Sequence, residues 1–231
     1  MTFLELCQTV RSEVGLSGTG PTTVIGQEGQ LLSIVNFTAE ADFLVQGLWL
    51  DWNFLWAQFA TETQTSKREL KKTKPDDLGS WDVTSFWLDY TSDTNYPLEL
   101  MAYREWRNLH RQGTMQIGVP SYAIIQPDQQ VFVEQASDKE YAFTADYFKA
   151  PYKMTVNTSK SPIPDAFHRC IVARAKTMWA EREDAPEILL ASAAEYQDVL
   201  DKLEAHSLPD QGARRSASSD TYAINLLVQP E

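Results

Sequence analysis

A run of apolar residues at alternating steps of three and four constrains the fold more than any other feature of the chain. Its members are Leu31, Ile34, Thr38, Ala41, Val45, Leu48, Trp52 and Leu55. This spacing aligns them along one side of an α-helix that packs nearly parallel to a neighbour. Phe37, Leu44 and Trp49 fall on other sides of the same helix. We therefore expect this helix to contact more than one partner.

A shorter helix is predicted near the N-terminus. Its apolar residues at helical spacing are Phe3, Cys7, Val10 and Val14. Thr2 followed three residues later by Glu5 forms a capping-box pattern, and Gly15 is a suitable residue to end the helix. The stretch from Gly15 to Gly26 is rich in Gly, Thr and Pro and predicts a long connection.

The hydrophobic period changes near residue 57, where alternation and threonine-rich composition become typical of strands. The elements predicted in this region are strands at 59–65, 81–90, 121–126, 130–134 and 141–149 and a short helix at 98–110. The short turns between the last three strands indicate an antiparallel meander. Tyr141, Phe143, Ala145 and Tyr147 should share one face of the last strand.

A helical hairpin is predicted after this region. Pro162 and Pro164 precede Asp165, a combination typical of a helix start. Phe167, Ile171 and Met178 then follow the helical period. Asp184-Ala185-Pro186-Glu187 interrupts the pattern and restarts it, and the second helix continues to about His206.

Together these segments predict an α+β fold: a four-helix bundle with an inserted antiparallel β-rich region and an extended C-terminal tail. Residues 1–56 would form the first part of the bundle and residues 161–208 the hairpin that completes it. Residues 57–160 would be the β-rich insertion with one short helix, and residues 209–231 a flexible linker and strand-like tail. With 231 residues and 43% apolar composition, the chain can bury a core of this size.

The C-terminal tail is predicted to bind another surface. Tyr222, Ile224, Leu226 and Val228 alternate on one face of a strand, with Leu227 between the last two. A single amphipathic strand after a flexible linker cannot complete a core, so it should add to a sheet edge or fill a groove. That surface can belong to its own subunit or to another protein. In the second case the tail would mark an assembly protein.

The charge of the chain argues against specific nucleic-acid binding as a main function. The net charge is −12 and the pI is about 4.7, so DNA phosphates are repelled. The acidity serves either solubility or a surface that DNA passes without binding. Residues 1–62 alone hold seven acidic residues and one basic residue, a net charge of −6.

The basic residues Lys67, Arg68, Lys71, Lys72 and Lys74 are concentrated in one run. No aromatic residue interleaves with them, which makes a phosphate-binding site weak. A solvated loop or ion pairs to an acidic neighbouring subunit are favoured. A role facing DNA remains the alternative.

No local motif for catalysis, metal or cofactor binding is present. The three histidines are far apart in sequence, and Gly15–Gly20 lacks the lysine and hydroxyl residue of a phosphate loop. Cys7 and Cys170 fall in apolar helical patterns, so no disulfide framework is implied. We therefore expect no enzyme and no cofactor. Carboxylates such as Asp198 and Asp201 are plentiful, so a soluble or virion-associated hydrolase that uses a carboxylate pair is the alternative.

Targeting signals are not expected. The first five residues lack a basic segment followed by a long apolar run, which a signal peptide requires. No stretch reaches the ~18 apolar residues of a membrane span. The two cysteines favour a reducing compartment.

Several short strings occur in an order and spacing similar to a known family. They are Phe3-Leu-Glu-Leu-Cys7, Gly15-Leu-Ser-Gly-Thr-Gly-Pro21, Thr61-Glu-Thr-Gln-Thr-Ser-Lys-Arg68, Ser80-Trp-Asp82, Tyr103-Arg-Glu-Trp-Arg-Asn-Leu-His110, Pro120-Ser-Tyr122, Phe143-Thr-Ala-Asp-Tyr-Phe148 and Pro162-Ile-Pro-Asp-Ala-Phe-His-Arg169. In this order the chain resembles the head-to-tail adaptor (neck or connector) proteins of tailed bacteriophages, of the gatekeeper or tail-tubular-like type. The resemblance covers roughly residues 2–210.

The resemblance implies a structural virion protein, not an enzyme, and no cofactor. It implies a ring of twelve copies below the portal protein, with the next neck or tail (nozzle) protein on the other side and DNA passing through the centre on ejection. It places the protein in the neck of the virion, and in the host cytoplasm during assembly. In relatives a C-terminal extension can embrace the portal. The resemblance therefore makes Tyr222, Ile224, Leu226, Leu227 and Val228 candidates for contact with the portal or a neighbour.

Overall fold

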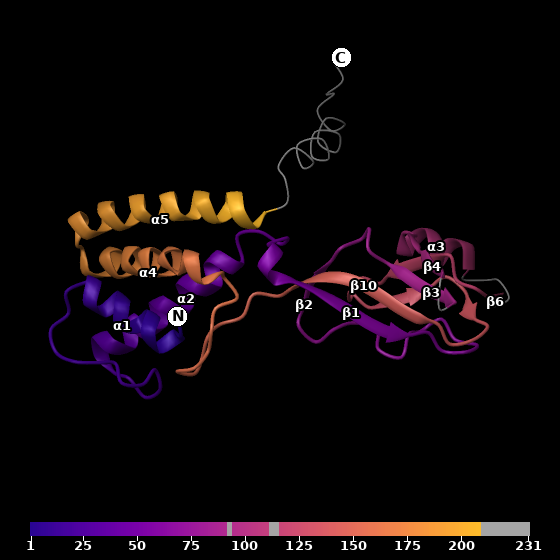
Figure 1. Ribbon diagram of the computed structural model, residues 1–231, viewed down its shortest axis with the longest axis horizontal. Coiled ribbons are helices and arrows are strands. Elements are labelled where there is room, and N and C mark those ends of the chain that lie inside the picture. The colour runs from indigo at the N-terminus through magenta and orange to yellow at the C-terminus, as the bar shows by residue number, and fades with distance from the viewer. Residues whose placement is uncertain (92–93, 111–115, 209–231) are drawn as a thin grey trace, which may run out of the picture. The chain divides into compact units, whose positions relative to one another are not determined.

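The computed structural model describes residues 1–91, 94–110 and 116–208 of the chain (Figure 1). The predicted tail residues Tyr222–Val228 lie outside these ranges. The chain has an α+β fold and divides into two compact units. Of the described residues, the helical unit comprises Met1–Phe54 and residues 151–208, and the β unit comprises the residues between Leu55 and Ala150. Residues 151–160, which the sequence assigned to the insertion, lie in the helical unit.

Helix α4 is the central element of the helical unit. The helices of this unit are α1 (Phe3–Glu13), α2 (Gly29–Gln46), α4 (His168–Glu183) and α5 (Pro186–Ser207), with a 3₁₀ turn at Asp165–Phe167 before α4. α4 packs against each of the other three helices, and α5 runs alongside it (Figure 1). Its buried residues lie on several sides and include the small residues Ala173, Ala175 and Thr177. Small side chains allow neighbouring helices to approach α4 on more than one side.

The predicted capping box at the start of α1 is confirmed. The Thr2 backbone N–H donates to Glu5 Oε2 at 2.8 Å, and the Glu5 N–H donates to Thr2 Oγ1 at 3.3 Å. Two of the backbone donors that a helix start leaves unpaired are therefore satisfied. Phe3, Cys7 and Val10 are buried, as their spacing predicted.

The prediction that the second helix continues to Leu55 is wrong beyond Gln46. α2 ends at Gln46, and Trp52 and Leu55 are buried from a turn and a 3₁₀ segment (Asn53–Leu55). The indole of Trp52 folds back, and its Nε1 donates to Val45 O at 3.1 Å. Val45 O also accepts from the Leu48 N–H at 3.3 Å, so the indole is a second donor to this carbonyl at the helix end. Leu48 and Trp52 thus continue the helical spacing in the sequence, but neither residue lies on the helix.

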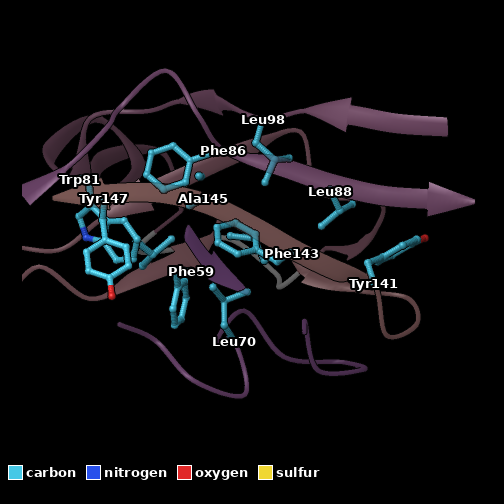
Figure 2. Close-up of a cluster of buried hydrophobic side chains, with 13 residues drawn as sticks. Phe59, Leu70, Trp81, Phe86, Leu88, Leu98, Tyr141, Phe143, Ala145 and Tyr147 are labelled. Carbon is cyan, nitrogen blue, oxygen red and sulfur yellow. The ribbon is translucent and has the colours of Figure 1, made fainter. Parts of the chain in front are cut away.

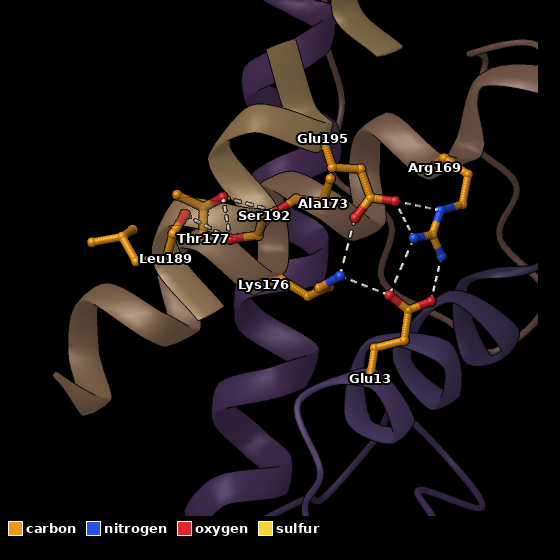
Figure 3. Close-up of polar contacts among 8 residues, drawn as sticks. All are labelled: Glu13, Arg169, Ala173, Lys176, Thr177, Leu189, Ser192 and Glu195. Carbon is orange, nitrogen blue, oxygen red and sulfur yellow. Dashed lines mark hydrogen bonds and ion pairs between the residues drawn. The ribbon is translucent and has the colours of Figure 1, made fainter. Parts of the chain in front are cut away.

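The hairpin of α4 and α5 follows the predicted interruption. Asp184 has a positive φ of 52°, and Pro186 occupies the first turn of α5. The hydroxyls of Thr177 and Ser192 lie 3.1 Å apart between the two helices. Each is also within hydrogen-bonding distance of a carbonyl of its own helix, Ala173 O and Leu189 O (Figure 3). The buried hydroxyls between the helices therefore have partners.

Four charged side chains join α1, α4 and α5 (Figure 3). Lys176 Nζ lies 2.8 Å from Glu13 Oε2 and 3.1 Å from Glu195 Oε2, and Arg169 also pairs with both carboxylates. Burial raises the pKa of Glu13 and Glu195, but the hydrogen bonds from Arg169 and Lys176 outweigh it, so both pKa values are lowered. The Lys176 side chain is only 13% exposed, which limits solvent screening.

A buried carboxylate ties α2 to residues 151–161. Asp42 is fully buried, accepts from Ser161 Oγ at 2.5 Å and accepts from Gln46 Nε2 at 2.7 Å. Gln46 also exchanges two 3.1 Å hydrogen bonds with the backbone of Tyr152. Burial raises the pKa of Asp42 to about 6, although the two hydrogen bonds act in the opposite direction.

The β unit is built on one five-stranded sheet. Its strands are β1 (Trp56–Glu62), β2 (Leu78–Trp81), β3 (Trp87–Thr91), β4 (Thr94–Pro97) and β10 (Ala142–Lys149). The order is β1-β10-β3-β4, all antiparallel, and β2 also pairs with β10. The remaining elements are β5 (Glu99–Leu100), α3 (Tyr103–His110), β6 (Ile117–Gly118), β7 (Tyr122–Ile125), β8 (Val131–Val133) and β9 (Ala136–Ser137).

The predicted three-stranded meander is wrong in its last strand. β7 and β8 pair antiparallel as predicted, but β10 joins the other sheet and pairs with β1 over seven residues, from Trp56 opposite Phe148 to Glu62 opposite Ala142. β5 also pairs with β7 in parallel. The predicted strand at 81–90 is two strands, because Asp82 Oδ1 accepts from Thr84 and forms a turn between them. Chain-distant pairings of this kind leave no local sequence signal.

The core of the β unit lies on one face of this sheet (Figure 2). The predicted alternation in β10 is confirmed, since Tyr141, Phe143, Ala145 and Tyr147 are all buried. The ring of Trp81 lies 5.5 Å from Phe59, 5.9 Å from Phe86 and 6.0 Å from Tyr147 between ring centroids. Its Nε1 donates to Gln129 O at 2.9 Å, so the buried indole has a polar partner.

Replacing Lys176 with Met should lower the free energy of unfolding by about 1–3 kcal/mol, because two partly buried carboxylates lose a shared cation. The lowered pKa values of Glu13 and Glu195 mean that the network stabilises the fold above their ordinary pKa of 4.5 and loses this effect as the pH falls below it. The cost should therefore be smaller at pH 3.5 than at pH 7, measured by urea unfolding. Lys202→Met is the control, since it removes an exposed pair with Asp198 and should cost less than about 0.5 kcal/mol. Equal losses in the two variants would contradict the prediction.

Asp42→Ala should destabilise the protein more at low pH than at neutral pH. The pKa of Asp42 is raised from 3.8 to about 6 in the fold, so the folded state binds more protons than the unfolded state between these values. Ionising the buried Asp42 carboxyl therefore lowers the stability of the wild-type protein. This loss grows as the pH rises from 3.8 to about 6 and is absent at lower pH. The loss caused by Asp42→Ala should be about 2 kcal/mol larger at pH 4.5 than at pH 7.5, measured by chemical unfolding. A pH-independent loss would contradict the raised pKa.

Candidate assembly interface

Helix α2 is apolar on its outward side as well as on its buried side. Ile34, Ala41 and Val45 are buried, as predicted. The outward side carries Leu32, Phe37, Phe43 and Leu44, of which the two leucines are exposed and the two phenylalanines are half-buried. A surface helix normally presents polar residues to water. The outward side of α2 therefore has the composition of a contact surface.

The turn after α2 extends this surface. Leu48 is 46% exposed and Leu50 is 70% exposed. Trp49 is also exposed, and its Nε1 donates to Glu204 Oε1 at 2.9 Å. We call the set Leu32, Phe37, Phe43, Leu44, Leu48 and Leu50 the α2 apolar surface. Asn36 and Glu40 lie between these apolar side chains on the same side of the helix, so the surface combines apolar residues with a few polar ones, as protein interfaces do.

The sequence identified only part of this surface. Phe37 and Leu44 were predicted to face a second partner, and the structure places both on the outward side. Leu48 was placed in the buried stripe, which is wrong, because the helix ends before it. Leu32 and Phe43 were missed. Their outward position follows from α2 helical geometry, which could have identified them.

The cations beside the α2 apolar surface already have partners. Lys153 Nζ lies 5.1 Å from the ring centre of Phe43 and pairs with Glu40. Arg182 lies 6.0 Å from the ring centre of Phe37 and 3.6 Å from Glu183 Oε1. The cations beside this surface are thus locally balanced by carboxylates.

The acidic residues of the first 62 positions do not all form exposed acidic surface. Asp42 is buried, while Glu13, Glu40 and Glu62 take part in ion pairs. The negative charge available to a solvent channel is therefore smaller than the net charge of −6 suggests.

Each residue of the basic run contacts a group of its own β unit. Lys71 Nζ lies 2.5 Å from Glu62 and 3.0 Å from Glu140, and Lys72 Nζ lies 3.1 Å from Asp76. Lys67 donates to Gln64, Lys74 donates to Asp128 O, and the Arg68 guanidinium lies over the Trp106 ring. The contact of this run with a neighbouring subunit or DNA stays a prediction.

The residues with possible catalytic chemistry lie in structural positions. Burial raises the pKa of the free thiols of Cys7 and Cys170 to about 12, which suppresses the reactive thiolate at neutral pH. His168 is buried with Nε2 2.9 Å from Ile163 O, and burial lowers its pKa. Asp198 and Asp201 are exposed on α5 and contact Lys202 and Gln197.

A hollow of about 230 Å³ in the β unit is lined by Tyr90, Tyr96, Val119 and Ser121, none of which is a carboxylate. Among the residues that the structure describes, no three His, Cys, Asp or Glu side chains gather as metal ligands would. Over the same residues, no helix combines the length and apolarity needed to cross a bilayer.

The family model for the SU10 adaptor protein matches residues 1–222 of this chain. The chain belongs to the SU10 adaptor protein family. A comparison with curated proteins finds no match. Membership of the SU10 adaptor family indicates a structural phage protein with a head-to-tail adaptor role, in agreement with the resemblance seen in the sequence. An adaptor acts by binding other proteins through its surfaces. The α2 apolar surface is therefore a candidate for one of these contacts.

Proposed function

We propose that this SU10 adaptor family protein forms a ring, twelve copies by resemblance, below the portal protein of a tailed phage, and joins the capsid to the tail. The match to the SU10 adaptor family over residues 1–222 supports the adaptor role. The ring, its contact with the portal and its place in the DNA path are proposals that extend this role. The neck type, gatekeeper or tail-tubular-like, is proposed on sequence resemblance alone.

The helical unit would form the wall of the ring. Its four helices would form a bundle and present the α2 apolar surface to the adjacent copy. A ring needs a head-to-tail interface, in which one surface of each copy contacts a different surface of the next. The exposed leucines of α2 and the following turn support this assignment. The net charge of −12 would keep DNA from adhering as it passes.

The other segments would bind the flanking proteins. Tyr222, Ile224, Leu226, Leu227 and Val228 would contact the portal or a neighbour, because their alternation suits strand addition or a groove. The run Lys67–Lys74 would face an adjacent subunit or the DNA. The β unit would reach the next neck or tail protein. The protein would act in the virion neck and be present in the host cytoplasm during assembly.

Leu44→Asp with Leu48→Asp should prevent ring formation on portal-bearing heads while the monomer stays folded. A charge in an apolar interface opposes its burial, so adaptor copies per head should fall about tenfold or more. Quantitative mass spectrometry of purified heads measures this number, and thermal unfolding checks the fold. Val156→Asp is a matched control, since Val156 is also 46% exposed in the helical unit but lies outside the α2 apolar surface. A full complement of copies in the double variant would contradict the assignment.

Deletion of the residues after Asp210 should leave a folded monomer that no longer joins portal-bearing heads. The described helices end at Ser207, so the deletion removes no residue of these helices. Co-sedimentation with heads measures joining, and circular dichroism measures folding. Full-length Arg214→Ala with Arg215→Ala is the control, because it changes the linker and keeps the alternating residues 222–228. Normal joining by the truncated protein would remove the tail from the proposal.

A further inference from the structure

One face of the five-stranded sheet is turned away from the core of the β unit. Phe59, Phe143 and Leu88 are buried on the core face of β1, β10 and β3. Since side chains alternate along a strand, the neighbouring residues point to the opposite face. The strand register aligns Ala60 of β1, Thr144 of β10, Trp87 of β3 and Pro97 of β4 as direct cross-strand partners. We call this set the Trp87 row.

The Trp87 row contains no charged residue and crosses four strands. Trp87 is 42% exposed, and Ala60 and Pro97 are exposed. An antiparallel sheet with one solvated face normally carries polar residues there. An exposed tryptophan inside an uncharged row has instead the composition found at the centres of protein interfaces.

Carboxylates border this row on both sides. Asp146 of β10 is two residues along the strand from Thr144, and Asp89 of β3 is two residues from Trp87, so both point to the same face. Among the described residues, neither Asp89 nor Asp146 has an ion pair. Glu62 and Asp77, by contrast, are paired with Lys71 and Lys149. Two half-buried carboxylates beside the row thus have no cation partner in the part of the chain that the structure describes.

The charge of this border selects the class of partner. Like charges across an interface are unfavourable, and complementary charges fix partner choice. DNA would be repelled by the two carboxylates. A second copy is disfavoured as well, because the chain carries a net charge of −12. A protein segment with apolar side chains between Lys or Arg residues would fit this face. Its apolar side chains would contact the Trp87 row, and its basic side chains would pair with Asp89 and Asp146.

We propose that the Trp87 row, bordered by Asp89 and Asp146, is the docking surface for the next neck or tail protein, which binds through an apolar segment flanked by basic side chains. This inference rests on the proposed function, which gives the adaptor such a partner. Trp87 supplies the apolar anchor, and the two carboxylates supply specificity for the basic flanks.

The test uses the full-length protein in phage that carry single altered adaptor genes. The variants are Trp87→Ala and the double change Asp89→Lys with Asp146→Lys. Tyr96→Ala is the control for the first, because Tyr96 is 48% exposed on β4 beside Pro97 and lies on the other face. Glu99→Lys with Glu105→Lys is the control for the second, because both carboxylates are exposed on β5 and α3.

Two quantities are measured on purified heads: adaptor copies per head by mass spectrometry, and the fraction of heads with tails by electron microscopy. Both variants should keep the adaptor number and lose tails about tenfold or more, whereas the controls should match the wild type. Normal tail numbers in both variants would overturn the inference. So would loss of the adaptor itself from variant heads, since the face would then serve the ring or portal. Absence of the wild-type adaptor from heads would instead refute the proposed function.

Selection for restored growth identifies the partner and covers the case in which Trp87→Ala does not fold. Revertants of the double lysine variant should carry changes from Lys or Arg to an uncharged or acidic residue in another virion protein. Changes confined to the adaptor gene would overturn the inference.

Discussion

The pairing of β1 with β10 is the interaction on which the arrangement of the chain depends. These strands lie at the two ends of the β unit in sequence, and seven residue pairs join them. Trp56 stands opposite Phe148, so the chain enters and leaves the β unit at neighbouring points. A closed insertion of this kind lets residues 1–54 and the chain from 151 onward belong to one helical unit. Because β10 also pairs with β2 and β3, the same strand organises the sheet core around Trp81 and Phe143.

The helical unit depends on polar anchors between segments that are distant in the chain. Asp42 holds Ser161, and Glu13 and Glu195 share Arg169 and Lys176. Such anchors contribute little net stability compared with apolar burial, because charged groups lose hydration when they are buried. Their geometric demands are strict, however, since an unpaired buried charge is costly. We infer that they fix which helix faces meet, while residues such as Ile34 and Ile171 supply most of the favourable free energy.

The features that the sequence predicted correctly depend on neighbours in the chain. The capping box of Thr2 and Glu5 and the break before Pro186 depend on residues within about one turn. The alternation from Tyr141 to Tyr147 depends only on strand geometry. The errors concern distant partners. Trp52 folds back on Val45, which ends a stripe that looked continuous, and β10 pairs with β1 instead of β8.

The candidate surfaces also divide into features that depend on chain neighbours and features that depend on distant residues. Phe37 and Leu44 were predictable because an apolar residue outside the main helical stripe must face something else. The ion pairs could not be predicted from spacing. Arg169 and Glu13 are separated by 156 residues, and Lys71 and Glu140 by 69. The Trp87 row was hidden for a related reason, since its four residues come from four strands whose register is set only in the folded sheet.

An adaptor has to bind copies of itself at one surface and different proteins at another. The α2 apolar surface and the Trp87 row differ in unpaired charge, a property that can separate these two kinds of partner. A ring contact between identical copies joins two different surfaces of one chain, and a surface whose charges are already paired needs no matching charge on the other. The α2 apolar surface is of this kind, because Lys153 and Arg182 beside it are already paired. The Trp87 row differs, since Asp89 and Asp146 have no described cation partner and favour a facing surface with basic side chains. In the proposed assembly, apolar area would supply affinity at both surfaces, and the charge at the border would determine which protein binds.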